Sequence, residues 1–216
     1  MWPLTSKKSN NNNSSPILEA CWKIRTRVDH IMADESCRML TVTSTGKAEG
    51  KTTVAVNLAR SYAQKNKKVL LIDANLRKPA LHKVFGLSNS NGLTNILRDR
   101  FEKSEIIRYT MIPNLFLISS GPNVVDPIEL LTSNQIANLL EKLKEEYDVI
   151  IVDTPPAMEW SDAQIVASMS DGALLVIKDD KVRMDQALKL KVMMEQVNAR
   201  IVGAVLNNVS RRRLAN

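Results

Sequence analysis

The sequence has little of what marks several protein classes. It holds two cysteines, two histidines and 4% aromatic residues among 216 residues. Cys21 and Cys37 each stand alone, without a second cysteine or histidine at metal-ligand spacing, so we expect reduced thiols in a cytoplasmic protein. No apolar run approaches the roughly 20 residues that a membrane-spanning helix needs. Residues 1–15 are polar and lack the apolar stretch of a signal peptide.

The overall composition is that of a globular chain, with 44% hydrophobic and 25% charged residues. The formal net charge of +7 invites a nucleic-acid interpretation. However, the basic residues are scattered, apart from a short block at 211–213, and the few aromatics offer no platform for stacking bases. We therefore expect no nucleic-acid partner. A basic face toward anionic lipid or an acidic protein is the alternative.

Three segments follow from the local composition. Residues 1–15 end in a run of asparagine and serine, and this composition predicts a disordered arm. Residues 16–208 predict one folded domain, and residues 209–216 form a short basic tail. No internal repeat or second composition regime divides the middle segment.

Within that domain, short apolar runs alternate with amphipathic segments. The predicted strands are Met39–Thr43, Lys68–Ile72, Leu115–Ser119, Val149–Val152, Gly172–Ile177 and Ile201–Leu206. The predicted helices are Pro16–Ala33, Thr52–Gln64, Pro127–Glu146, Asp162–Met169 and Asp185–Asn198. Strands that are apolar throughout indicate a sheet covered on both faces, and the alternation with helices makes it mostly parallel. The predicted fold class is therefore α/β, a parallel sheet flanked by helices.

The segment Ser44-Thr-Gly-Lys-Ala-Glu-Gly-Lys-Thr-Thr53 lies directly after a predicted strand and opens a predicted helix. A glycine-bearing turn at a helix start presents backbone N–H groups to phosphate. Lys51 is expected to reach the β- and γ-phosphates, and the Thr52 hydroxyl to ligate Mg²⁺. The strict phosphate-loop pattern fails at its first glycine, which is Thr45 here. The residues expected to contact ATP are Thr45, Gly46, Lys47, Ala48, Glu49, Gly50, Lys51, Thr52 and Thr53.

Two predicted strands end in an aspartate, Asp73 and Asp153. The carboxyl edge of an open parallel sheet is where ligands bind. A carboxylate beside a triphosphate can hold Mg²⁺, which favours few carboxylates together with phosphate oxygens and water. Either aspartate alone could instead be a turn or capping residue. Two of them with a phosphate loop favour a P-loop site for a metal–nucleotide complex.

These segments resemble the bacterial tyrosine kinases of capsule and exopolysaccharide synthesis. Leu71-Ile-Asp73-Ala-Asn75-Leu-Arg77-Lys78-Pro79 is similar to the family's second Walker motif, and Val149-Ile-Ile-Val-Asp153-Thr-Pro-Pro156 to its Walker B segment. Further similar segments are Ser120-Gly-Pro122, Pro127–Leu131, Ser161-Asp162-Ala163 and Gly203–Asn207. The resemblance covers about residues 17–208.

The resemblance implies a Mg-ATP-dependent protein-tyrosine kinase. By it, Lys51, Asp73 and Asp153 would be the catalytic residues, with Asp73 as the base near the acceptor hydroxyl. Asn207 would contact adenine. The metal would be held by Thr52, Asp73, Asn75 and Asp153.

The family's partners are also implied. A membrane chain-length-determinant protein would activate the chain and hold it at the inner face of the cell membrane. The helix containing Glu19 and Arg25 would make a homo-oligomer, and protein tyrosines would be the substrates.

The sequence departs from the family at four places. Lys47-Ala48 replaces the usual Pro-Gly, Asn75 replaces a second aspartate, and Trp22 replaces a basic residue of the self-association segment. The fourth departure is that no tyrosine cluster lies near residue 216. The three tyrosines, Tyr62, Tyr109 and Tyr147, lie at or near predicted helices, where packing or partial exposure is expected.

Two other functions stay open. One is a weakly active or non-catalytic ATP-binding scaffold of a polysaccharide export complex, motivated by Ala48, Asn75 and the missing tyrosine cluster. The other is an ATPase switch of the partition or septum-site type. Those switches carry a signature lysine at the position of Gly46, whereas Lys47 falls one place later here.

Overall fold

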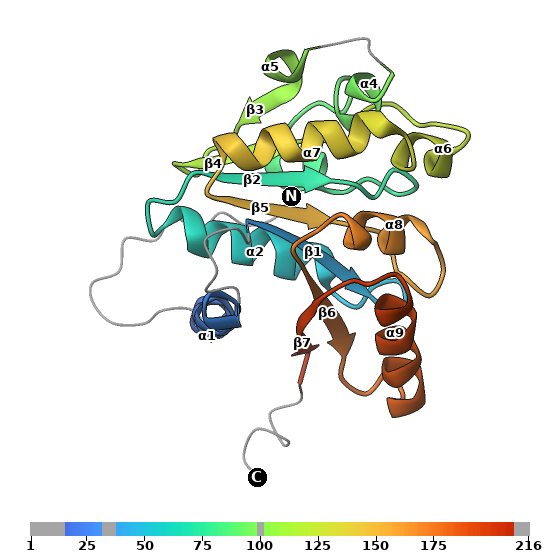
Figure 1. Cartoon of the computed structure of the whole chain (residues 1–216). Helices are drawn as coiled ribbons and strands as arrows, with labels where there is room; N and C mark the ends of the chain where they lie inside the picture. The colour runs from blue at the N-terminus through green and yellow to red at the C-terminus, as the bar shows by residue number, and fades with distance from the viewer. Residues whose placement is uncertain (1–15, 32–37, 99–101, 210–216) are drawn as a thin grey trace, which may run out of the picture.

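The computed structural model in Figure 1 describes residues 16–31, 38–98 and 102–209. The predicted arm at 1–15 and all but the first residue of the predicted tail lie outside these ranges. The strands are β1 (Met39–Ser44), β2 (Val69–Asp73), β3 (Ile107–Tyr109), β4 (Leu115–Ile118), β5 (Val149–Asp153), β6 (Gly172–Lys178) and β7 (Ile201–Asn207). They form one sheet in the order β3-β4-β2-β5-β1-β6-β7.

Helices connect the strands. They are α1 (Pro16–Ile31), α2 (Lys51–Ala63), α3 (Leu81–Phe85), α4 (Leu93–Ile96), α5 (Lys103–Ile106), α6 (Pro127–Leu131), α7 (Asn134–Glu146), α8 (Asp162–Ser168) and α9 (Met184–Gln196). Among the described helices, none combines the length and the apolar character that crossing a bilayer requires.

The sheet is parallel except at one edge, where β3 runs antiparallel to β4. Figure 1 shows α1 and α2 on one side of the sheet and α7 and α8 on the other. Alternate residues of one strand enter opposite cores: Val69 and Leu71 pack with α2, and Leu70 and Ile72 pack with α7. Both faces are therefore covered, which explains why β2 and β5 are apolar up to their terminal aspartates, and it confirms the predicted fold class.

The predicted strands and central helices are found, with ends that differ by one or two residues from the predicted ones. A single helix over Pro127–Glu146 is wrong. Asp126 caps α6 by accepting hydrogen bonds from Ile128 N at 2.9 Å and Glu129 N at 3.2 Å. The chain then breaks at Ser133, whose extended backbone starts a second helix, α7. The apolar periodicity continues across this break and concealed it.

Several short elements were not predicted. They are β3 and the helices α3, α4 and α5, each of three to five residues. A segment of that length carries too few residues for a periodic signal, and its conformation depends on the sheet edge on which it packs. The predicted end of the first helix at Ala33 lies outside the described residues, and α1 is described to Ile31.

Candidate functional site

The loop between β1 and α2 turns sharply at two residues. Ala48 and Gly50 have positive φ angles of 58° and 93°. α2 begins at Lys51, and within the described part of the chain the backbone N–H groups of residues 48–53 donate no hydrogen bond. N–H groups left unpaired at the start of a long helix are the arrangement that binds phosphate. The loop therefore has the geometry that its sequence predicts.

Two carboxylates brace the first half of this loop. Glu49, which is 2% exposed, accepts hydrogen bonds from Thr45 N at 3.2 Å and Gly46 N at 2.8 Å. Glu159 accepts from Lys47 N at 3.2 Å and also lies 2.8 Å from the Lys47 ammonium. Hydrogen bonding to Lys47 lowers the pKa of Glu159. The backbone N–H groups of Thr45, Gly46 and Lys47, three residues expected to contact ATP, therefore already donate to carboxylates.

Thr52 and Asp153 join the start of α2 to the end of β5. Thr52 Oγ1 donates to Asp153 Oδ2 at 2.7 Å. Asp153 is fully buried, and its Oδ1 has no hydrogen-bond partner among the described groups. Burial raises the pKa of Asp153 to about 7, although the Lys51 ammonium favours the charged form; the neighbouring Asp73 raises the pKa further. This orphaned oxygen beside a hydroxyl fits a hard cation such as Mg²⁺.

Asp73 pairs in register with Asp153 across β2 and β5. Its Oδ2 accepts hydrogen bonds from Ala80 N and Leu81 N, both at 2.9 Å, and its Oδ1 accepts from Asn75 N at 3.2 Å. Burial raises the pKa of Asp73, and these three donors oppose the rise. The two aspartates therefore meet as predicted. Asp73 also serves as the turn anchor that the sequence left open as an alternative.

Asn75, an expected metal ligand, is 6% exposed and holds a turn. Its Oδ1 accepts a hydrogen bond from Lys78 N at 3.1 Å. Among the described residues, no three histidine, cysteine, aspartate or glutamate side chains are grouped to hold a metal. A Mg²⁺ site here would therefore depend on few protein ligands, with phosphate and water completing the shell.

Arg77 is fixed by two residues outside its own motif. Its guanidinium makes a two-pronged contact with Asp162, with Nε at 2.9 Å and Nη2 at 3.0 Å. Its Cζ lies 3.9 Å from the centroid of the Trp160 ring. Asp162, at the start of α8, is fully buried, so this pair ties the loop after β2 to the segment after β5.

Asn207, expected to contact adenine, ends β7 and lies against the phosphate loop. Its Nδ2 donates to the Glu49 carbonyl at 2.8 Å. A Cβ on Gly50 would come within 2.0 Å of this nitrogen, so only glycine fits there. Asn207 is thus placed beside the site and supports the loop directly.

Two residues at the site, Glu159 and Lys181, were missed by reasoning from sequence, and the contact of Asp162 with Arg77 was not expected. Glu159 contacts the N–H and the ammonium of Lys47, and Lys181 donates to the Lys47 carbonyl. Asp162 holds the Arg77 guanidinium. These contacts join loops that lie up to 134 residues apart. No periodicity or motif spacing could have indicated them.

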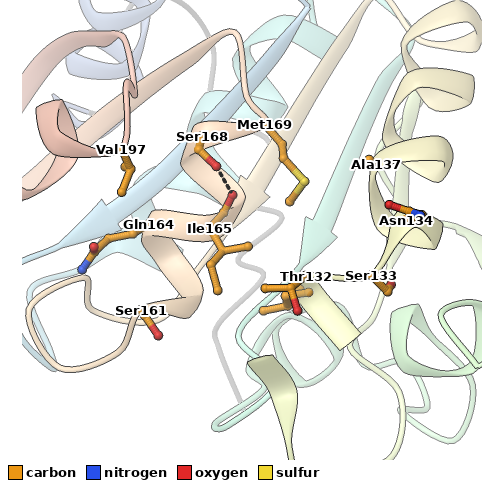
Figure 2. A pocket seen from close by; sticks show the side chains of 11 residues that line it. Thr132, Ser133, Asn134, Ala137, Ser161, Gln164, Ile165, Ser168, Met169 and Val197 are labelled. Atoms are coloured by element: carbon orange, nitrogen blue, oxygen red, sulfur yellow. Dashed lines mark hydrogen bonds between the residues drawn. The ribbon is translucent and has the colours of Figure 1, made fainter. Parts of the chain in front are cut away.

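The structure contains a cavity of about 410 Å³, and the side chains that line it are drawn in Figure 2. Its lining comes from the α6–α7 junction, from α8 and from Val197. None of the expected ATP or metal residues lines it, so this cavity is separate from the predicted nucleotide site.

Comparison with known proteins places the chain in a family. The family model described as an AAA domain matches residues 37–205. The tyrosine-protein kinase YwqD of Bacillus subtilis is 38% identical over 184 residues, covering 85% of this chain and 78% of YwqD. The solved kinase domain of the Escherichia coli tyrosine kinase ETK is 31% identical, with a TM-score of 0.88, covering 95% of this chain and 84% of that one.

A more distant structure shares only the fold. The septum site-determining protein MinD from Pyrococcus horikoshii has a TM-score of 0.69 at 23% identity, covering 82% of this chain and 73% of that one. Because the domain match spans most of the sequence and YwqD is covered over 78% of its length, the chain belongs to the family of bacterial tyrosine-protein kinases.

Proposed function

We propose that the chain is a Mg-ATP-dependent protein-tyrosine kinase that regulates capsular or exopolysaccharide synthesis and export. The observation that carries this proposal is the convergence of Lys51, Thr52, Asp73 and Asp153 at the carboxyl edge of the sheet, beside the unpaired N–H groups of residues 48–53. Relatives with the same fold and more than 30% identity are named tyrosine-protein kinases.

The chemistry requires positioning and charge neutralisation more than covalent help. Lys51 and the N–H groups at the start of α2 would hold the phosphates and stabilise the charge that develops on the transferred group. When bound, Mg²⁺ would neutralise phosphate charge, held by Thr52 and Asp153. Asp73 Oδ1 accepts a single N–H donor, so it retains a lone pair for the proton of an acceptor hydroxyl.

The partner that we propose is a membrane chain-length-determinant protein. It would activate the nucleotide site and keep this chain, as a cytoplasmic protein, at the inner face of the cell membrane. The support is the family assignment, since regulation of polysaccharide export has to reach a membrane complex.

For a homo-oligomer we propose the outer face of α1. Arg25 is buried, donating to the Ser61 carbonyl at 2.7 Å, and therefore anchors α1 on α2. Glu19 and Lys23 form an exposed ion pair, and Trp22 beside them is 40% exposed. These three side chains would contact the neighbouring subunit.

A second candidate is a weakly active ATP-binding scaffold. The observation that favours it is that both Asp73 oxygens and the Asn75 oxygen already accept backbone hydrogen bonds. If these bonds persist with nucleotide bound, the carboxylate base is less available and turnover falls.

The test is phosphotyrosine mass spectrometry after incubation with Mg-ATP, using the chain fused to the cytoplasmic tail of a chain-length protein. The control is Lys51→Met, which removes the phosphate-binding ammonium. We expect phosphotyrosine that depends on Lys51. ATP binding without phosphotyrosine would contradict the kinase function. In that case, ATP hydrolysis would indicate an ATPase switch, and the absence of hydrolysis would indicate an ATP-binding scaffold.

A further inference from the structure

The three tyrosines of the chain differ sharply in accessibility. Tyr62 is 7% exposed, and its hydroxyl donates to Asp29 Oδ1 at 2.6 Å. Tyr147 is 4% exposed and packs in the core beside α7. Tyr109 is 81% exposed, at the end of the edge strand β3. The expectation that all three are packed or partly exposed is therefore wrong for Tyr109, because it lies on an edge strand that the sequence did not reveal.

Tyr109 is accessible yet held in place. Its ring contacts that of Phe116, with centroids 5.2 Å apart and planes tilted by 55°. Tyr109 belongs to β3, which pairs with β4, and this pairing places Tyr109 opposite Phe116. Two residues later, Met111 is 86% exposed, so the chain protrudes here. A protruding, backbone-anchored phenol is the form in which a second protein could bind a tyrosine.

The chain's own phosphate loop cannot reach this hydroxyl. The loop follows β1, and β1 is four strands from β3 in the sheet order, which amounts to roughly 19 Å sideways at about 4.8 Å per strand. Tyr109 also pairs with the first half of β4, whereas the loop and both aspartates lie at the opposite, carboxyl ends of the parallel strands. Phosphate transfer to Tyr109 therefore requires a second copy of the chain.

We infer that Tyr109 is the tyrosine that one copy of this protein phosphorylates on another, an inference that rests on the proposed kinase function. The phenolic oxygen attacks the γ-phosphorus of ATP bound by the second copy, and the bond from that phosphorus to the bridging oxygen breaks. ADP leaves, and the phenolic proton passes to a carboxylate of the second copy's site. The products are phospho-Tyr109 and ADP.

The surroundings suit a phosphate at this position. The Lys68 ammonium lies 5.9 Å from the centroid of the Phe116 ring that Tyr109 contacts, and 4.6 Å from that of Tyr147. A phosphotyrosine carries nearly two negative charges near neutral pH, so the Lys68 ammonium, which lies over the ring that Tyr109 contacts, would stabilise it.

The experiment mixes two variants that are each unable to modify themselves at this residue. Lys51→Met retains Tyr109 but lacks the phosphate-binding lysine, whereas Tyr109→Phe retains the site but lacks the acceptor. The full chains, each fused to the cytoplasmic tail of a chain-length protein as in the test of the kinase function, are incubated with Mg-ATP, separately and together, and every tyrosine is read by mass spectrometry. A random glutamate–tyrosine copolymer serves as an independent acceptor, and Tyr147→Phe is the matched control.

We expect phosphate on Tyr109 of the Lys51→Met chain only in the mixture. In Tyr109→Phe, self-phosphorylation should fall at least tenfold while copolymer phosphorylation is unchanged, and Tyr147→Phe should retain both. Copolymer phosphorylation without phospho-Tyr109, or phosphate on Tyr62 or Tyr147 instead, would overturn this inference and leave the kinase function intact. Phosphate on neither copolymer nor chain would overturn both.

Discussion

The Thr52 hydroxyl donates a 2.7 Å hydrogen bond to the buried carboxylate of Asp153, across 101 residues of sequence. This contact joins the first turn of α2 to the end of β5 and sets the hydroxyl next to the orphaned Asp153 Oδ1. The residue that would ligate a cation and the residue that would order its shell are therefore already in contact.

The first prediction concerns this hydroxyl. Thr52→Val keeps the shape of the side chain but removes the oxygen, so we expect ATP binding to lose its dependence on Mg²⁺ and to weaken at least tenfold. Thr52→Ser keeps the oxygen and should stay within a few-fold of the parent chain. Isothermal titration with and without Mg²⁺ measures both; equal Mg²⁺ dependence in the two variants would contradict the assignment.

Ala48 is the second target. It adopts a φ of 58°, a left-handed conformation that is strained for a residue with a Cβ. Ala48→Gly should raise the free energy of unfolding by about 0.5–1 kcal/mol, since the relief of strain exceeds the added freedom of the unfolded chain. Ala55→Gly, inside α2, should instead lower the free energy of unfolding. Urea unfolding of both variants checks this, and destabilisation by Ala48→Gly would refute it.

The third prediction concerns pH. Because burial raises the pKa of Asp153 to about 7, the folded chain holds this proton at pH values where the unfolded chain has released it. The stability contributed by this group is therefore present below about pH 4 and is lost as pH rises to about 7. Asp153→Asn cannot titrate, so its stability relative to the parent chain should increase across that window.

The measurement is urea unfolding between pH 4 and pH 8, without nucleotide or divalent cations. The stability difference between Asp153→Asn and the parent chain should grow with pH and then level off above about pH 7. A difference that stays constant throughout would show that Asp153 keeps its ordinary pKa in the folded protein.

The fourth prediction concerns Arg77 and Asp162. Arg77→Ala leaves the fully buried Asp162 carboxylate without its cation, so we expect a loss of about 3–5 kcal/mol in the free energy of unfolding. Adding Asp162→Asn to that variant removes the unpaired charge and should recover part of the loss. A double-mutant cycle of unfolding free energies measures the coupling between Arg77 and Asp162. Purely additive effects of the two substitutions would contradict a stabilising interaction between these residues.

Asn75 is the fifth target. Asn75→Asp keeps an oxygen to accept from Lys78 N and adds a negative charge two residues from Asp73. We expect half-maximal ATP turnover at a lower Mg²⁺ concentration, or a higher turnover. An Mg²⁺ titration decides; no change in either quantity would place Asn75 outside the metal shell and leave it as a turn residue.

The sequence by itself determined the central architecture. The apolar runs at β2, β5 and β6 could be buried only in a sheet covered on both faces, and the phosphate loop could be recognised from its place between a strand and a helix. The meeting of Asp73 and Asp153 followed from the same reasoning, because parallel strands end at one edge. These features depend on residues that are close in sequence or on simple topology.

Only the tertiary structure decided how the loops are held and what is exposed. The ion pairs Lys47–Glu159 and Arg77–Asp162 each join two separate loops. Which loops meet depends on how the strands are ordered in space. The exposure of Tyr109 depends on an antiparallel edge strand of three residues, which is too short to have a period of its own. Burial and pairing across a sheet are properties of the packed chain, and local sequence patterns do not carry them.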